Sequence, residues 1–179
     1  VVMYSELDAK IWGIAWPAIV ANISIPLLGL VDAALLGHLD SPVHLAAVAI
    51  GSAILSFLYW GFSFLRMGTT GEVARASGAG DENRARLALA RSAVIALGIA
   101  ALLLLLQSPL LELGLAIMDP SAAIRDQAGN YAAIRLWSAP AALAMFVAIG
   151  WFYGPADGRT PLYLQLFSNG LNMVPDGVV

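Results

Sequence analysis

The sequence contains no cysteine and little charge. Without cysteine among its 179 residues, the chain forms no disulfide and no thiolate metal site. Charged residues make up 12% of it, whereas a soluble domain uses about 25% to build its water-facing surface. Hydrophobic residues make up 60%, and the mean hydropathy is +0.80. These values exclude an ordinary soluble enzyme, a disordered tail and a nucleic-acid-binding protein, which would need a basic surface. Most of the chain is expected to lie in lipid.

Five apolar stretches follow one another along the chain, separated by short polar segments. About 20 apolar residues cross a hydrocarbon core of about 30 Å, so stretches of this length are expected to span a membrane. They lack period-two alternation, which favours helices over a β-barrel. The predicted fold class is all-α, a polytopic transmembrane helical bundle with four full spans and a truncated fifth. The approximate spans are 11–36, 45–65, 87–106, 131–152 and 161–179.

Two of these spans carry further signals. In the fourth, Pro140 is expected to produce a kink, because proline removes one backbone donor from a helix. The fifth continues to Val179 without a polar cap, a flanking Lys or Arg, or an aromatic anchor. We therefore interpret residues 1–179 as a fragment of a longer protein.

Positive charge is distributed unevenly between the two ends of the predicted spans. If the N-terminus is cytoplasmic, seven of the nine Lys and Arg residues fall on the cytoplasmic side. Since cytoplasmic loops are rich in these residues, the N-terminus and the polar segment 66–86 are predicted to be cytoplasmic, and this segment is expected to be a loop. The seven are Lys10, Arg66, Arg75, Arg84, Arg86, Arg91 and Arg159, while Arg125 and Arg135 fall on the other side.

Asp32 is the acidic residue of the first predicted span. An acid at the centre of a span costs about 2.5–3.5 kcal/mol on insertion scales, so it usually faces the bundle interior or a water-filled cavity. A carboxyl group in this place suits a residue that binds and releases a proton during transport. Alternatively, Asp32 lies close enough to Asp40 to be solvated at the outer interface.

Three polar residues recur along the fifth predicted span. Asn169, Asn172 and Asp176 are spaced i, i+3 and i+7, which at about 100° per residue confines them to one face of a helix. Carboxylate and amide oxygens suit a small hard cation such as Na⁺, or a hydrogen-bonded proton site. The alternative is that they form interhelical hydrogen bonds, as Asn commonly does in membranes.

Proline and glycine interrupt the first two spans. Pro17 and Pro26 lie in the first, and Gly51 and Gly61 in the second. Broken helices beside an intramembrane acid are typical of alternating-access transporters. Small residues also permit close helix packing, and both explanations remain open.

Motifs for catalysis and nucleotide binding are absent from the sequence. Segment 66–83 has neither Gly-Lys-Ser/Thr nor a complete Gly-x-Gly-x-x-Gly, and it is expected to be a turn rather than a phosphate loop. His38 and His44 flank a short segment with Asp40, for which a solvated loop is preferred over a metal site. Without a Ser/His/Asp set, the chain is not expected to be an enzyme and needs no cofactor.

Several segments together resemble the multidrug and toxic compound extrusion (MATE) family, and within it the DinF branch. The likeness extends over nearly the whole chain. The matching segments are Pro17–Gly37 with its Asp32, Leu36–Pro42, Phe64–Gly71, Ile134–Pro140, Gly150–Pro161 and Asn169–Asp176.

This resemblance implies a bacterial inner-membrane antiporter with two six-helix lobes, of which the chain supplies part of the N-terminal lobe. Such an antiporter exports varied, often cationic amphiphilic compounds in exchange for H⁺ or Na⁺. Asp32 is similar to the family's first-helix acid, whose protonation is linked to bending at a proline matching Pro17. Asn172 and Asp176 resemble the amide and acid that complete the cation site, where Na⁺ is the one metal ion expected. The implied partners are drug-like small molecules, the bilayer and the missing C-terminal lobe, with no nucleic acid.

Two other functions remain as alternatives. A lipid-linked oligosaccharide flippase of the same superfamily would favour an arginine-lined cavity for pyrophosphate, yet only Arg91 and Arg135 lie within the predicted spans. A non-transporting truncated membrane scaffold would give Asp32 no role.

The charge asymmetry generates a topology test. Single cysteines placed at Ser5 and Ser77 of the complete protein should resist a membrane-impermeant thiol reagent in intact cells, because both positions are predicted to be cytoplasmic. Strong labelling of either cysteine before the cells are opened would reverse the predicted orientation.

Overall fold

The computed structural model describes residues 8–9, 11–13, 15–20, 23, 42–155, 157 and 159–176, with the side chains of the last helix up to Phe167. These residues form helices joined by short turns, with no strand among them, which confirms the all-α fold class. Besides short helical pieces within 8–20, the helices are α2 (Pro42–Gly61), α3 (Phe64–Gly78), α4 (Glu82–Leu105), α5 (Gln107–Met118), α6 (Ala122–Leu136), α7 (Ala139–Tyr153) and α8 (Arg159–Asp176).

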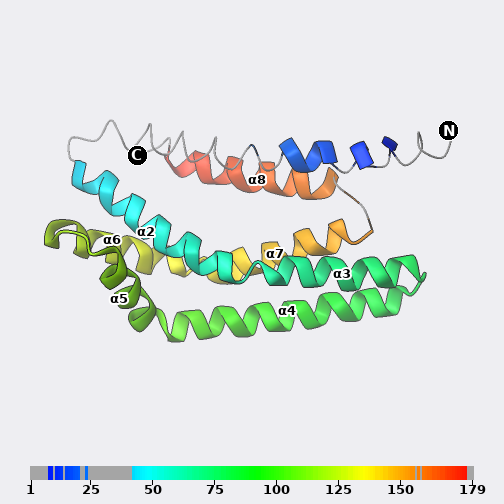
Figure 1. The fold of residues 1–179 in the computed structure, drawn as a ribbon, viewed down its shortest axis with the longest axis horizontal. Coiled ribbons are helices and arrows are strands. Elements are labelled where there is room, and N and C mark those ends of the chain that lie inside the picture. The colour runs from blue at the N-terminus through cyan, green and yellow to red at the C-terminus, as the bar shows by residue number, and fades with distance from the viewer. Residues whose placement is uncertain are drawn as a thin grey trace.

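The long helices lie roughly parallel or antiparallel to one another (Figure 1). Helix α2 continues into α3, and α4 returns antiparallel beside α3. Helix α6 packs on α2, α7 packs on both α3 and α4, and α8 packs on α7. The α3–α4 turn and the α7–α8 connection lie at the same end of the bundle, at the right in Figure 1, and the α5–α6 connection lies at the opposite end.

Apolar side chains fill both the core and much of the surface. The core is built from Ala and Leu, and one stripe of α6 (Ala128, Ala132 and Leu136) is fully buried. Large apolar side chains also lie exposed along α2 and α4, among them Phe57, Val94 and Leu105. Exposed apolar surface on this scale is unusual for a soluble monomer and fits a helical protein surrounded by lipid.

Glycines let several helix backbones approach one another closely. A Cβ atom at Gly150 of α7 would lie 2.7 Å from the carbonyl oxygen of Arg66 on α3. One turn later, a Cβ at Gly154 would overlap the side chain of Val73. Gly150 and Gly154 thus form a Gly-x-x-x-Gly pair of the kind that brings membrane helices into contact.

The two glycines singled out in the second predicted span have different roles. A Cβ at Gly51 would lie 2.6 Å from Cδ1 of Tyr131, so this glycine serves the close packing of α2 on α6. Gly61 has no neighbouring atom within 4 Å of such a Cβ, and it is the last residue of α2. Close packing therefore explains Gly51, while Gly61 marks a helix break.

Two helix breaks divide the longest helical pairs. Residues 62–63 separate α2 from α3, and residues 137–138 separate α6 from α7 with a bend of 53°. The bend expected from Pro140 is present, with the break just before it. At both breaks the backbone forms i→i+3 hydrogen bonds, such as Ser138 N donating to Arg135 O at 3.0 Å. Tight turns therefore keep the backbone paired where the α-helical pattern stops.

The structure corrects the expectation for segment 66–86. This segment is largely helical, because α3 extends to Gly78 and α4 begins at Glu82, so only residues 79–81 form a turn. The packing of α3 against α7 stabilises a helix that its glycines and polar residues disfavour. Helix α5 was not predicted, since its apolar run is too short to cross a bilayer.

The span boundaries also differ from the predicted ones. Among the described residues, Val43–Gly78 and Glu82–Leu105 are long and apolar enough to cross a membrane, and α6 with α7 makes a third span if the bent pair is counted as one. Helix α8 begins at Arg159 rather than at residue 161, and most of the first predicted span, 11–36, lies outside the described residues.

The α3–α7 contact generates a stability prediction. Changing Gly150→Ala should lower the free energy of unfolding by about 1–3 kcal/mol, the usual cost of overpacking, because a Cβ there meets backbone. Gly71→Ala on α3 is the matched control, since a Cβ at Gly71 meets nothing within 4 Å. Thermal unfolding in detergent, followed by circular dichroism, compares the two variants. Equal unfolding temperatures of the two variants would show that the close approach of α7 to α3 does not stabilise the fold.

Candidate functional site

The first-helix residues of the predicted site are only partly described. Asp32 and Pro26 lie outside the described residues. Pro17 lies within the helical stretch 15–20, and its side chain is buried. A proline inside a helix leaves one backbone carbonyl without its usual donor, so the helix is weakened at this point. Pro17 is therefore a position at which the first helix would bend most readily.

The polar residues of the fifth predicted span share one continuous helix. Asn169, Asn172 and Asp176 all belong to α8, whose backbone is helical from Arg159 to Asp176. Their spacing therefore places the three positions on one face of α8, as predicted. Their side chains lie outside the described part of the structure. No cluster of three or more His, Asp or Glu residues suited to a metal ion occurs among the described residues.

Asp157 fixes the start of α8. Its Oδ1 accepts hydrogen bonds from the backbone N–H groups of Arg159 at 2.9 Å and Thr160 at 3.2 Å, and its Oδ2 accepts one from the Thr160 hydroxyl. The Thr160 side chain, followed by the backbone bonds, lowers the pKa of Asp157 below its usual value. Asp157 is thus a helix cap that satisfies donors otherwise left unpaired at an N-terminus.

A polar contact joins α2 to α6 inside the bundle. The Ser52 hydroxyl lies 3.1 Å from the Tyr131 hydroxyl, which also accepts a hydrogen bond from Arg135 Nη1. The Arg135 guanidinium carbon lies 5.7 Å from the centre of the Tyr131 ring. Arg135 is exposed and stands beside the α6–α7 break. Tyr131 therefore pairs with the arginine through both its hydroxyl and its ring.

Polar atoms near this contact are buried without full pairing. The Tyr59 hydroxyl is buried beside the Ser138 side chain, with Arg135 nearby, and Gln127 Oε1 is buried without a hydrogen bond to the described residues. Nearby, Gln107 donates to the carbonyl oxygen of Ala133 at 3.1 Å. Buried polar atoms without full pairing are costly. Tyr59 lies close to the α2–α3 break, whereas Gln127 lies within α6.

Sequence reasoning identified Arg135 but missed its partners. Ser52 and Tyr59 are spaced i, i+7 on α2, and Tyr131 and Arg135 are spaced i, i+4 on α6, with Ser138 three residues later in the α6–α7 break. The angular argument that revealed the face of α8 would have revealed both stripes. No polar contact was predicted for these residues, because a single Tyr or Ser is common in an apolar helix.

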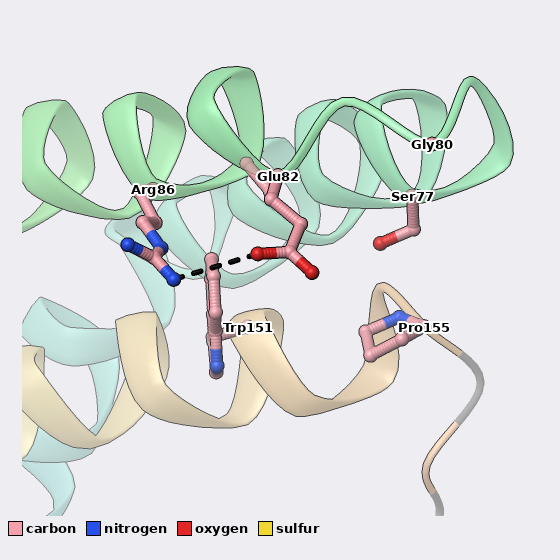
Figure 2. Close-up of a pocket in the computed structure, with 7 residues that line it drawn as sticks. Ser77, Gly80, Glu82, Arg86, Trp151 and Pro155 are labelled. Carbon is pink, nitrogen blue, oxygen red and sulfur yellow. Dashed lines mark hydrogen bonds and ion pairs between the residues drawn. The ribbon is translucent and has the colours of Figure 1, made fainter.

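A cleft of about 460 Å³ opens where α3, α4 and the end of α7 meet. Figure 2 shows Glu82 and Arg86 extending from α4 toward Trp151 of α7, with Pro155 just beyond the end of α7. Arg86 Nη2 lies 3.4 Å from Glu82 Oε2, and both side chains are largely exposed. An exposed i, i+4 pair of this kind contributes little to stability, so the cleft is a surface feature beside the α3–α4 turn.

The cap of α8 generates a pH-dependent prediction. Asp157→Ala should lower stability by about 1 kcal/mol at neutral pH, because it removes the capping acceptor. Since the folded-state pKa is lowered, the carboxylate's contribution is complete above the ordinary aspartate pKa of about 4 and is lost as the pH falls below it. Thermal unfolding from pH 7 to pH 3 should therefore show a shrinking difference between wild type and variant. A difference independent of pH would contradict the capping role of the charge.

Comparisons with known proteins cover nearly the whole chain. It is 45% identical over 169 residues to DNA damage-inducible protein F of Escherichia coli (strain K12), covering 94% of this chain and 37% of that protein. It is 31% identical over 187 residues to the chloroplastic protein DETOXIFICATION 44 of Arabidopsis thaliana, covering 97% and 36%. The chain thus spans a little over a third of the length of these relatives.

Two solved structures share the fold. A MATE protein in complex with MaD3S superposes with a TM-score of 0.84 at 22% identity, over 94% of this chain and 38% of that one. A MOP superfamily transporter from Pyrococcus furiosus, described as having a binding pocket of reverse polarity, gives 0.85 at 22% identity, over 94% and 37%. The family model described as MatE matches residues 17–178. With this match and the identity to its relatives, the chain belongs to the MatE family.

Proposed function

We propose that the protein is a cation-coupled antiporter that exports amphiphilic, often cationic small molecules across the bacterial inner membrane, and that this chain forms part of its N-terminal lobe. The observation that carries the proposal is the MatE match over 17–178, which includes a helix with one polar face. A transporter of this kind changes the side of the membrane on which a substrate lies, without enzymatic chemistry.

The coupling site is assigned to Asp32, Asn172 and Asp176, with Asn169 extending the polar face of α8. An ionisable residue inside a membrane bundle is costly and is usually retained for work on an ion or proton. A carboxylate–amide set of this kind offers oxygen ligands to Na⁺ and an acceptor to H⁺. Both coupling ions suit these residues.

Helix breaks supply the movement that such coupling requires. Alternating access needs elements that adopt two arrangements, and discontinuous helices are the usual device. Pro17 weakens the first helix, and the α6–α7 pair already bends by 53°. The proposal gives Pro17 and Pro26 the role of bending the first helix when Asp32 changes its protonation or ion occupancy.

Charge placement supports a cytoplasmic N-terminus. The α3–α4 turn, which follows Arg75 and precedes Arg84 and Arg86, lies at the same end of the bundle as the α7–α8 connection before Arg159 (Figure 1). This end of the described bundle thus carries four of the eight described arginines, as we expect of a cytoplasmic end.

The central prediction concerns Asp32. Asp32→Asn should nearly abolish efflux and its pH dependence while leaving membrane insertion intact. The amide is nearly isosteric with the protonated acid but cannot ionise. A cation drives a conformational equilibrium only through its different affinity for the two states, and the amide removes most of that difference. Efflux of a fluorescent cationic dye from cells, at several values of pH and matched expression, measures the effect.

Two further variants complete this experiment. Asp176→Asn should impair efflux less than Asp32→Asn if Asp32 alone carries a proton, and comparably if both bind one Na⁺. Asp126→Asn is the matched control, because Asp126 is an exposed acid on α6 that is not assigned to the coupling site. Wild-type, pH-dependent efflux by the Asp32→Asn protein would refute the proposal and leave Asp32 as an interface residue.

A further inference from the structure

An amphipathic groove of about 450 Å³ runs between α3 and α4, and it shares no lining residue with the cleft of Figure 2. Both helices contribute charged and apolar side chains to it. Its principal lining residues are Phe64, Gly68 and Glu72 on α3, and Arg84, Arg91 and Ile95 on α4.

The two arginines point into one groove from one helix. Arg84 and Arg91 are seven residues apart, which brings them to the same face of α4 at about 10 Å separation along its axis. Within the described part of the chain, neither side chain forms an ion pair. The one acid lining the groove, Glu72, lies 3.1 Å from Arg75. The groove therefore carries an excess of positive charge.

The remaining wall of the groove is apolar and open. The side chains of Phe64, Leu87 and Ile95 are 53%, 54% and 51% exposed. Gly68 lies on the α3 side of the groove, and a Cβ there would meet nothing within 4 Å. The missing side chain leaves open space beside the apolar wall.

The antiparallel pairing of α3 and α4 gives the groove a direction. Because α3 runs toward the turn and α4 away from it, Glu72 and Arg84 lie near the turn, and Phe64 and Ile95 lie deeper in the bundle. Arg91 lies between these ends, about 13 Å along α4 from its first residue. A phospholipid has the same order along the membrane normal, with its phosphate outside and its acyl chains inside.

From this geometry we infer that the α3–α4 groove binds one anionic phospholipid, with the headgroup phosphate between Arg84 and Arg91 and an acyl chain along the deeper residues Phe64 and Ile95. An arginine inside the start of an apolar helix needs an anion or water as its partner, and basic pockets between membrane helices bind anionic headgroups. The inference rests on membrane insertion and is independent of the coupling ion and the exported substrate.

Native mass spectrometry of the complete protein in detergent tests this site. With added phosphatidylglycerol or phosphatidylcholine, the wild type should retain one phosphatidylglycerol preferentially. Arg84→Gln with Arg91→Gln should lose that preference several-fold. Arg86→Gln is the matched control, since Arg86 lies on the same helix but lines the cleft of Figure 2. Unchanged retention by the double variant, or equal loss in the control, would overturn the assignment.

Further variants guard against misfolding and separate the two parts of the site. Arg84→Lys with Arg91→Lys keeps both charges and should retain most of the preference, whereas loss as complete as with Gln would overturn the electrostatic argument. Gly68→Leu fills the open space beside the apolar wall without removing charge and should weaken retention of phosphatidylglycerol. If Gly68→Leu binds the lipid as the wild type does, the acyl chain does not lie in this groove and the proposal fails.

A competition experiment distinguishes a lipid from a free anion. Glycerol 3-phosphate, which has the phosphate but no acyl chain, should displace phosphatidylglycerol only at a large molar excess. Displacement at equal concentrations would show a site for soluble phosphate compounds and would refute the lipid.

Discussion

The close approach of α7 to α3 is the contact on which the rest of the described bundle depends. Lipid chains are as apolar as leucine, so helices in a membrane gain little from hiding apolar surface and depend instead on intimate van der Waals packing. Gly150 and Gly154 allow that packing against Arg66 and Val73. Helix α7 in turn contacts α4 and carries α8 on its surface. The position of the polar face of α8 therefore depends on two residues that have no side chain.

Rigid packing in one half of the bundle contrasts with the breaks near its middle. Helices α2 and α6 pack side by side, as do α3 and α7, and the breaks at 62–63 and 137–138 divide each long pair. The Tyr59 hydroxyl is buried without full pairing near the first break, and Ser138 lies exposed in the second, where its hydroxyl donates to the carbonyl oxygen of Arg135. A region that has already given up regular helical bonds and full polar pairing changes shape at lower cost than the glycine-packed half.

The sequence predicted the features that depend on local pattern and missed those that depend on tertiary contact. Long apolar runs indicated membrane helices, and spacing alone placed Asn169, Asn172 and Asp176 on one face of α8. Most of α3 was expected to be a loop because segment 66–86 is polar and lies between two apolar spans. Its glycines also disfavour a helix, but packing against α7 overrides that local preference. Tyr131 and Ser52 are 79 positions apart, so no local sequence pattern predicts that their hydroxyl groups meet.

The arginines within the predicted spans show how the chain meets the cost of charge in lipid. Arg135 is paired by Tyr131, which contributes both a hydroxyl and a ring at the α6–α7 break. Arg91 forms no ion pair among the described residues. It lines the α3–α4 groove, whose charged end and deeper apolar end are arranged in the same order as the headgroup and acyl chains of a phospholipid. A guanidinium in an apolar helix keeps its charge at any physiological pH, so its partner must be protein, water or a lipid phosphate. Arg135 is therefore stabilised by a side chain of the protein, whereas the proposed partner of Arg91 is a lipid of the surrounding membrane.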